Sequence, residues 1–286
     1  MQSSNKKIKK DFIELWEKRD ETYYIHWTRE EPKTQIQLAF REHWELFRKI
    51  IKKLGIKGGN CLEVGCGRGT ISSYLSDAGY SCTLLDVSIE VLKNAKKIYK
   101  DFKLKAKFVR GDVFYLPFFE EKFDIVFSIG LLEHFKNPKK IIKEQLRILK
   151  KEGLFLAYIV PNRSVNIQHK HEWINHILRG YVQFYEGNMK KDKEKHIFRT
   201  SYQSKLYTNI LKDLGAEKAE HCGVYPLPMI SHSIEFPFSL MPPESERTIV
   251  AYFLKILTEK RRKYKRNPWV CNEAEGQGFF VWAIKK

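Results

Sequence analysis

The sequence predicts an α/β fold in which helices cover both faces of a doubly wound, mostly parallel sheet. Three observations lead to this prediction. Short apolar segments alternate with amphipathic segments of helix length from residue 60 to residue 160. The stretch 123–128 is almost entirely apolar, as expected of a strand buried on both faces. The glycine-rich segment 60–69 supplies the sharp turn by which such a strand leads into a helix.

Two helices are expected before the alternating part begins. Residues 8–19 repeat apolar side chains at helical spacing, and a longer repeat of the same kind follows over 36–54. Thr34 is a suitable N-cap for the second helix, and Gly55 is a suitable end. We interpret both as packing helices of an N-terminal cap, residues 1–58. An alternative is that this aromatic segment closes over a ligand.

The alternating part, residues 59–160, contains five expected strands with helices between them. The strands are expected at residues 60–65, 81–86, 107–110, 123–128 and 154–160. Helices are expected over residues 69–78, after Ser88 and after Asn137-Pro138. Serine and asparagine cap helices well, and proline suits a first helical turn.

The last part of the chain departs from strict alternation. A helix over 201–214 and a strand near 217–224 are followed by a basic helix near 247–264 and an apolar run at 278–284. Two strands at the end, with an insertion between them, suit a sheet whose last strand is reversed. We therefore expect residues 201–286 to complete the same sheet domain.

The composition favours one large domain, or a core domain with an accessory cap, in a reducing compartment. The chain has 286 residues, of which 43% are hydrophobic, which is enough for a substantial core. No apolar run approaches the roughly 18 residues of a transmembrane helix. The five cysteines include no Cys-x-x-Cys pair, and no apolar stretch of a signal peptide follows the N-terminus. A cytoplasmic location is expected.

The net charge of +18 limits the choice of partners without deciding it. Such a surface attracts nucleic acid, acidic membranes or anionic small molecules. The lysines are spread over nearly every segment, so we interpret most of the charge as solvated helix faces. Nucleic acid is the less favoured partner. Contact with a membrane surface stays open for the basic helix near 247–264, although we expect its apolar face to pack on the domain.

The glycine turn raises the question of which cofactor it holds. Its spacing is G-x-G-x-G from Gly65 to Gly69, whereas dinucleotide enzymes use G-x-G-x-x-G. Asp86 ends the second strand and is placed to bind ribose hydroxyls, although it also suits a helix cap. Asp112 follows the third strand and is placed to bind an adenine amino group, although a simple turn explains it as well. Residues 128–135 leave the fourth strand at the crevice where such sheets bind ligands.

These segments resemble the class I S-adenosylmethionine-dependent methyltransferases, in the type 11 branch that includes small-molecule enzymes. The matching segments are Glu63-Val64-Gly65-Cys66-Gly67-Arg68-Gly69, Leu85-Asp86-Val87-Ser88, Gly111-Asp112-Val113 and Phe123 through His134. The match is specific over residues 59–160, looser from residue 196 onward, and absent from 1–58 and 161–195. The resemblance implies seven strands, the last one antiparallel, with S-adenosyl-L-methionine as cofactor and S-adenosyl-L-homocysteine as product.

The resemblance also implies which residues hold this methyl donor. Glu63, Gly65 and Gly67 would line its methionine end, and Asp86 its ribose. Asp112 and Val113 would contact the adenine, and Ser128 would lie beside the amino group. The expected donor-binding set is Glu63, Gly65, Cys66, Gly67, Asp86, Val87, Asp112, Val113, Ser128 and Ile129.

Methyl transfer from a reactive donor needs alignment and exclusion of water more than it needs acid–base groups. A base is required mainly when the acceptor is a poorly acidic hydroxyl. His134 is the candidate base, and a structural role for it stays open. His169, His171 and His176 could bind a metal, but no fourth ligand stands out nearby, so no metal is expected.

The acceptor is expected to be a small molecule that is partly hydrophobic. No Asn-Pro-Pro-Tyr sequence follows the fourth strand, where enzymes that methylate base amines carry it, and no cysteine follows the fourth or fifth strand. Residues 161–200 are expected to form a helical lid over the acceptor, and 225–246 a second specificity segment. An RNA-directed methyltransferase and a non-catalytic donor-binding module remain alternatives, and a nicotinamide enzyme is a more distant one. The oligomeric state is left open.

Overall fold

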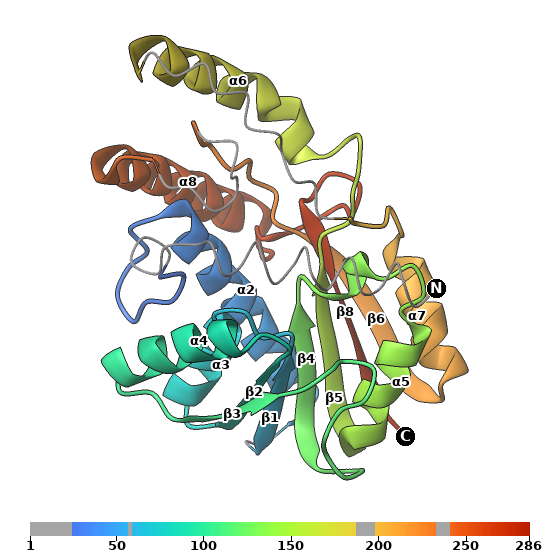
Figure 1. Cartoon of the computed structure of the whole chain (residues 1–286). Coiled ribbons are helices and arrows are strands. Elements are labelled where there is room, and N and C mark those ends of the chain that lie inside the picture. Colours follow the sequence, from blue (N-terminus) through green and yellow to red (C-terminus); the bar gives the residue numbers. More distant parts are fainter. Residues whose placement is uncertain (1–24, 57–58, 187–197, 233–240) are drawn as a thin grey trace.

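The computed structural model describes residues 25–56, 59–186, 198–232 and 241–286. One sheet runs through the molecule (Figure 1). Its described strands are β1 Asn60–Val64, β2 Ser81–Asp86, β3 Ala106–Arg110, β4 Phe123–Ile129, β5 Leu149–Ile159, β6 Ala216–Val224, β7 Val270–Cys271 and β8 Gly278–Lys285. Their order across the sheet is β3-β2-β1-β4-β5-β8-β6-β7.

The strand order creates a point at which the winding of the chain reverses. The parallel strands β2 and β3 extend the sheet on one side of β1, and β4 and β5 extend it on the other. β8 runs antiparallel to both β5 and β6. In open sheets of this kind, ligands bind outside the carboxyl ends of the strands at the reversal point. The border between β1 and β4 is therefore where a site is expected.

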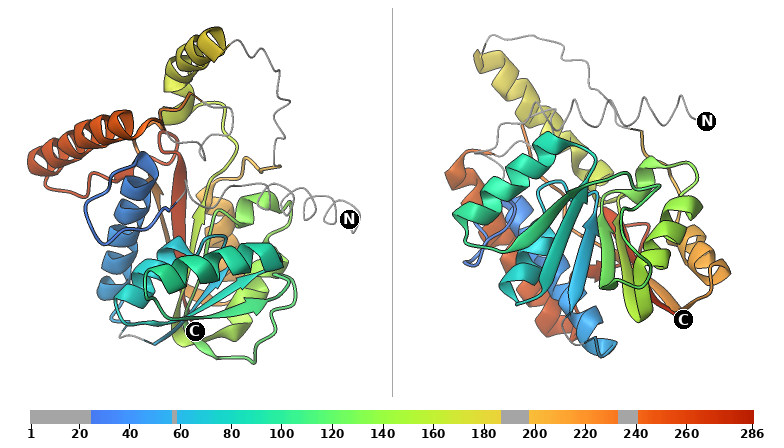
Figure 2. Two further views of the ribbon diagram at one scale, coloured as in Figure 1. Left: turned by 60° about the vertical axis from the view of Figure 1, so that its left-hand side comes forward. Right: turned by 60° about the horizontal axis from the view of Figure 1, so that its bottom comes forward.

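Helices form a layer on each face of the sheet. They are α2 Gln35–Lys53, α3 Thr70–Asp77, α4 Ile89–Asp101, α5 Lys139–Ile148, α6 Ile167–Glu186, α7 Ser204–Asp213 and α8 Pro243–Tyr264, with a 3₁₀ turn η1 at Leu132–His134. One buried cluster joins the sheet to α2, α3, α4 and α8, and a second joins its other face to α5 and α7. Figure 2 shows the two layers from further directions, with α6 projecting beyond them.

Two helix starts form as their sequences predict. The side chain of Thr34 accepts a hydrogen bond from the amide of Gln37 at 3.3 Å at the start of α2. The side chain of Ser88 accepts one from the amide of Val91, also at 3.3 Å, at the start of α4. Each bond satisfies an amide that has no partner inside its helix.

The predicted fold class is confirmed, including the helix before the sheet, the helix after the fifth strand and the reversed closing strand. The prediction of seven strands is wrong, because β7 is an eighth. It comprises only two residues, which pair antiparallel with Gly223 and Val224 of β6. A strand of that length has no alternating pattern to reveal it. The helix expected at residues 8–19 lies outside the described residues.

The basic helix α8 packs on the domain as expected. Val250, Phe253 and Leu257 are buried against the first cluster. At its start, the carboxylate of Glu246 accepts hydrogen bonds from the amide of Gln35 at 2.7 Å and from the amide of Met241 at 3.1 Å. The carboxylate therefore ties the first turn of α2 to that of α8. None of the helices within the described residues is long and apolar enough to cross a membrane.

Candidate functional site

The glycine turn between β1 and α3 is held in a conformation that only glycine adopts readily. Gly65 and Gly69 have φ angles of 67° and 66°. A Cβ atom at Gly65 would lie 2.8 Å from Leu131 Cδ1, and one at Gly69 would lie 2.2 Å from Leu84 Cδ2. The amide of Gly65 donates to the carbonyl of Leu85 at 2.8 Å, which ties the turn to β2. Glycine is therefore required at both positions, by backbone conformation and by close packing at this edge of the sheet.

Asp86 lies at the end of β2, directly beside the turn. Its Oδ2 accepts a hydrogen bond from the amide of Gly67 at 3.2 Å, and its Oδ1 accepts one from the amide of Ser88 at 3.1 Å. Burial raises the pKa of the Asp86 carboxyl above its usual value, while these bonds act to lower it. The carboxylate organises the turn, and each oxygen keeps a lone pair for a further donor. Its contact with ribose stays a prediction.

Glu63 is a second carboxyl group beneath the same turn. It is only 2% exposed and accepts a hydrogen bond from the amide of Ser72 at 3.2 Å. Burial raises the pKa of Glu63 to about 8, and the nearby charge of Asp86 adds to the shift. The thiol of Cys66 is also buried, and burial raises its pKa well above the usual value. This supports the interpretation of Cys66 as a small filler of the turn.

Ser128 lies on β4, across the reversal point from β1. Its side chain is fully buried, and its Oγ has no hydrogen-bond partner among the described residues. A buried hydroxyl without a partner is costly unless a ligand satisfies it. The next residue, Ile129, is partly buried against the first cluster. The orphaned hydroxyl, the bare glycine turn and the two carboxyl groups fit the amino-acid and ribose ends of S-adenosylmethionine.

The segment after β3 forms a turn. Asp112 Oδ1 accepts a hydrogen bond from the amide of Phe114 at 3.0 Å, and its carbonyl accepts one from the amide of Tyr115 at 3.0 Å. Val113 packs against the second cluster, and the carbonyl of Val87 accepts a hydrogen bond from Arg110 Nε at 3.3 Å. Asp112 therefore lies in a turn, which is compatible with both of its interpretations. The contact with adenine remains a prediction, as does the role of Val87.

His134 ends η1, just beyond β4, and is only 4% exposed. Its Nδ1 lies 2.7 Å from the carbonyl oxygen of Phe198. Because a carbonyl can only accept, Nδ1 carries a proton. A backbone hydrogen bond at Gly130 also acts on the ring. Burial lowers the pKa of His134, which keeps the imidazole neutral near pH 7.

Glu133 belongs to this site, although the sequence analysis gave it no role. It is 1% exposed, and its Oε1 accepts a hydrogen bond from the amide of Val160 at 3.2 Å. Its Oε2 is buried without a partner among the described residues. Its carbonyl accepts from the amide of Thr200 at 2.7 Å. The sequence does contain a signal for Glu133, because it is an acidic residue beside His134 shortly after a buried strand.

A polar hollow of about 460 Å³ lies beyond β5, on the side expected for the acceptor. Residues from three segments line it: Asn162, Arg163, Ser164, Val165, Ser201, Gln203, Asn272, Glu273 and Ala274. Glu273 accepts hydrogen bonds from the side chains of Arg163 and Ser204, which ties the three segments together. No local sequence pattern indicates this arrangement, since the residues are far apart along the chain.

The two expected specificity segments differ from their predictions. In the second segment, Tyr225, Leu227 and Met229 are buried in the first cluster, so they are core residues. Residues 233–240 of that segment lie outside the described part of the chain. In the first segment, Gln168 and Asn175 form hydrogen bonds between α6 and the domain. Of the apolar residues expected to cover an acceptor, Trp173 and Ile177 are exposed, whereas Ile174 and Leu178 are half-buried. His171 Nδ1 lies 2.9 Å from the carbonyl of Ile167 in the same helix.

Comparison with known proteins places this architecture in a family. A family model described as a methyltransferase domain matches residues 62–157. An uncharacterised protein of Methanocaldococcus jannaschii is 30% identical over 198 residues, which are 69% of this chain and 78% of that protein. The phthiotriol/phenolphthiotriol dimycocerosates methyltransferase of Mycobacterium tuberculosis is 32% identical over 155 residues. That match spans 51% of this chain and 57% of the enzyme, so the chain aligns with little more than half of that relative.

Solved structures share the fold. A SAM-dependent methyltransferase from Thermotoga maritima superposes with a TM-score of 0.52 at 17% identity, over 87% of this chain and 91% of that one. Similarity at this identity supports the architecture alone. Together with the family model and the donor motifs, it leads to one conclusion. The chain belongs to the class I, Rossmann-like methyltransferases, whose cofactor is S-adenosylmethionine.

Proposed function

We propose that this chain transfers the methyl group of S-adenosylmethionine to a small-molecule acceptor. One observation carries the proposal: the glycine turn, the Asp86 carboxylate and the unpartnered Ser128 hydroxyl lie at the carboxyl ends of neighbouring strands. They come from β1, β2 and β4, which surround the reversal point of the sheet. Ligands of doubly wound sheets bind at that point.

Each group has a distinct part in holding the donor. The two oxygens of Asp86 each bind one backbone amide and retain a lone pair for a ribose hydroxyl. The Ser128 hydroxyl is available to a polar group at the methionine end. Glu63 lies below that end, where a cationic amino group would favour its ionised form.

Bound S-adenosylmethionine supplies an electrophilic methyl group, so the residues around it act mainly by positioning the acceptor and excluding water. Nδ1 of His134 donates to the Phe198 carbonyl, and a second backbone contact, at Gly130, also acts on the ring. We assign His134 the removal of a proton from the acceptor as the new bond forms. Its lowered pKa keeps the imidazole neutral at neutral pH, as a base requires.

The acceptor is assigned to the side of the polar hollow beyond β5. Asn162, Gln203 and Asn272 line that hollow and can form hydrogen bonds with polar groups of an acceptor. The Mycobacterium tuberculosis relative is named for the methylation of phthiotriol and phenolphthiotriol dimycocerosates, which supports a small molecule over a nucleic acid. Residues 225–229 were expected to contact the acceptor, but they belong to the core. They therefore no longer argue for a hydrophobic acceptor.

The donor assignment is tested by titration calorimetry with S-adenosylmethionine. Asp86→Ala should weaken binding by at least about tenfold, because charge-assisted hydrogen bonds are worth roughly 1.5–3 kcal/mol. The matched control is Asp213→Ala at the exposed end of α7. Equal affinity in Asp86→Ala would make the ribose assignment wrong.

Turnover is tested by mass spectrometry, which detects the S-adenosylhomocysteine formed with a panel of phenols, amines and carbon acids. RNA is included as the competing acceptor. Product with a small molecule and none with RNA is the expected result. Product with RNA alone would replace this proposal by the RNA-directed alternative. Donor binding without product from any acceptor class would favour the non-catalytic module.

A further inference from the structure

Arg199 lies in a short segment of the chain that is held against the proposed base. The residue before it, Phe198, accepts at its carbonyl from Nδ1 of His134 at 2.7 Å. The residue after it, Thr200, donates from its amide to the carbonyl of Glu133 at 2.7 Å. The backbone on both sides of Arg199 is therefore fixed next to η1, at the carboxyl end of β4.

The same segment also borders the polar hollow beyond β5. The carbonyl of Thr200 accepts a hydrogen bond from the amide of Asn162 at 2.9 Å, and Ser201 follows directly along the chain. Asn162 and Ser201 both line the hollow. Arg199 is therefore placed between the proposed base and the side of the molecule that we assign to the acceptor.

The charge of Arg199 acts on buried groups of the site and has no counterion. Burial lowers the pKa of His134 and raises that of Tyr158 in β5, and the positive charge of Arg199 acts to lower both. The side chain of Arg199 is half-buried, and it forms no hydrogen bond or ion pair with the residues that the structure describes. A partly buried cation without a partner is costly unless a ligand supplies an acceptor.

A second arginine nearby shows how this protein satisfies a guanidinium group internally. Arg163, in the wall of the hollow, donates to the carbonyl and to the carboxylate of Glu273. Glu133 does not serve Arg199 in this way, because no ion pair joins the two in the described part of the chain. One oxygen of Glu133 accepts from a backbone amide instead. Arg199 is therefore available to an anion from outside the chain.

We propose that Arg199 binds an anionic group of the acceptor, either a carboxylate or a phosphate. A guanidinium group binds both with two parallel hydrogen bonds, which a lysine cannot reproduce. The net charge of +18 attracts anionic molecules toward the protein. The inference rests on the proposed function, because that function places the acceptor beside His134.

Anion binding is tested by calorimetry, without any need for methyl transfer. The full chain, saturated with S-adenosylhomocysteine, is titrated with protocatechuate and with inorganic phosphate. At least one of these anions should bind the native chain, and the tighter one identifies the preferred group. Arg199→Gln should weaken that binding at least about tenfold, because charge-assisted hydrogen bonds are lost. Arg199→Lys should bind with intermediate affinity, because it keeps the charge but not the two-point geometry.

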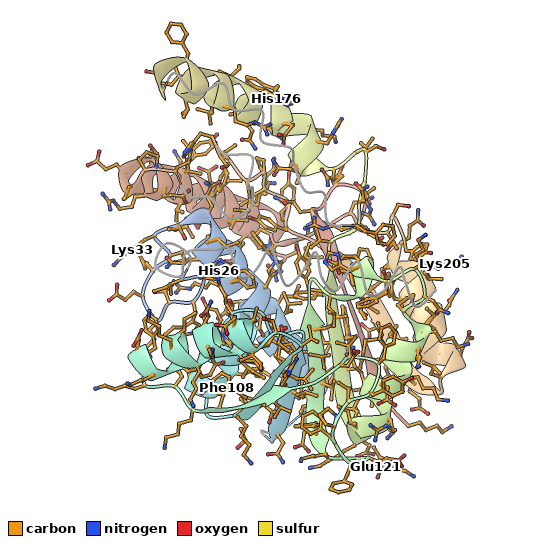
Figure 3. All side chains as sticks on the ribbon, in the orientation of Figure 1. His26, Lys33, Phe108, Glu121, His176 and Lys205 are labelled. Atoms are coloured by element: carbon orange, nitrogen blue, oxygen red, sulfur yellow. The ribbon has the colours of Figure 1, made fainter. Side chains whose placement is uncertain are left out.

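Lys205→Gln is the matched control, because it removes the same charge from an exposed residue of α7. Figure 3 labels Lys205 at the right-hand edge of the molecule in that view. This variant should bind the anion as the native chain does. An equal loss in Arg199→Gln and Lys205→Gln would show only an effect of net charge and would overturn the role of Arg199. A native chain that binds neither anion would overturn it as well.

Turnover separates this inference from the proposed function. Acceptors are supplied in pairs that differ in one charged group: para-aminobenzoate with its methyl ester, and para-aminophenyl phosphate with para-aminophenol. The native chain should methylate an anionic member with the higher kcat/KM, and Arg199→Gln should remove this preference while keeping its affinity for S-adenosylmethionine. Faster turnover of the neutral members by the native chain would overturn this inference and leave the proposed function intact. Anion binding that depends on Arg199, without product from any acceptor, would contradict the proposed function alone.

Discussion

The glycine turn after β1 and the helix after β5 both follow strands of one sheet, yet their surroundings differ sharply. At Gly69 in the turn, an added Cβ would lie 2.2 Å from a buried leucine, and the φ angle is positive. At Gly180 in α6, an added Cβ would meet nothing within 4 Å. The first region is determined by crowding inside the protein. The second projects beyond the two helix layers, where an added side chain has open space.

The largest effect is expected for a substitution in the crowded glycine turn. Gly69→Ala should lower the free energy of unfolding by roughly 2–5 kcal/mol, because it adds strain at positive φ to overlap with Leu84. Gly180→Ala is the matched control and should be neutral or stabilise α6 by up to about 1 kcal/mol. Urea unfolding monitored by circular dichroism measures both. Similar losses in the two variants would contradict the difference drawn between the regions.

The next effect concerns the buried carboxyl below the turn. Folding raises the pKa of Glu63 from 4.5 to about 8, so the folded state holds a proton that the unfolded state releases within this range. The free energy of unfolding should therefore fall by a few kcal/mol as pH rises from 4.5 to about 8. Glu63→Gln should flatten that decline. Urea unfolding as a function of pH checks it, and an equally steep decline in the variant would remove Glu63 as the cause.

The third prediction concerns His134, the proposed base. His134→Ala should lower kcat by roughly 10²–10⁴-fold, the usual contribution of a general base, with little change in donor affinity. In the native chain, kcat/KM should fall on the acid side only below pH 6.5, because burial lowers the pKa of His134 from that value. Steady-state kinetics across pH measure both effects. Unchanged turnover in the variant would leave His134 with a structural role.

The smallest effect is expected for a substitution at an exposed position of α6. Trp173→Ser should change the free energy of unfolding by no more than about 0.5 kcal/mol, because the side chain is 60% exposed. Thermal unfolding measures this. A loss of several kcal/mol would mean that the outer face of α6 packs against the protein, and would remove the contrast with the glycine turn.

Much of the donor side was predictable because its features are local. The spacing of Gly65, Gly67 and Gly69, the position of Asp86 and the cap at Ser88 lie within thirty residues of one another. The alternation of strand and helix is likewise encoded in side-chain periodicity. The acceptor side was predicted less well. Glu133 contacts Thr200, and Arg163 contacts Glu273, across long stretches of chain that no local pattern connects.

The sequence by itself therefore determined the fold class, the glycine turn and the position of Asp86 beside it, because these follow from backbone conformation and short-range spacing. The tertiary structure alone decided which side of α6 faces the protein. The helical period of apolar residues was legible, and it suggested a lid with its apolar face inward. Hydrogen bonds between residues 229–231 and the side chains of Gln168 and Asn175 attach the helix through a side that periodicity did not indicate, because buried polar backbone must find partners wherever the chain places them.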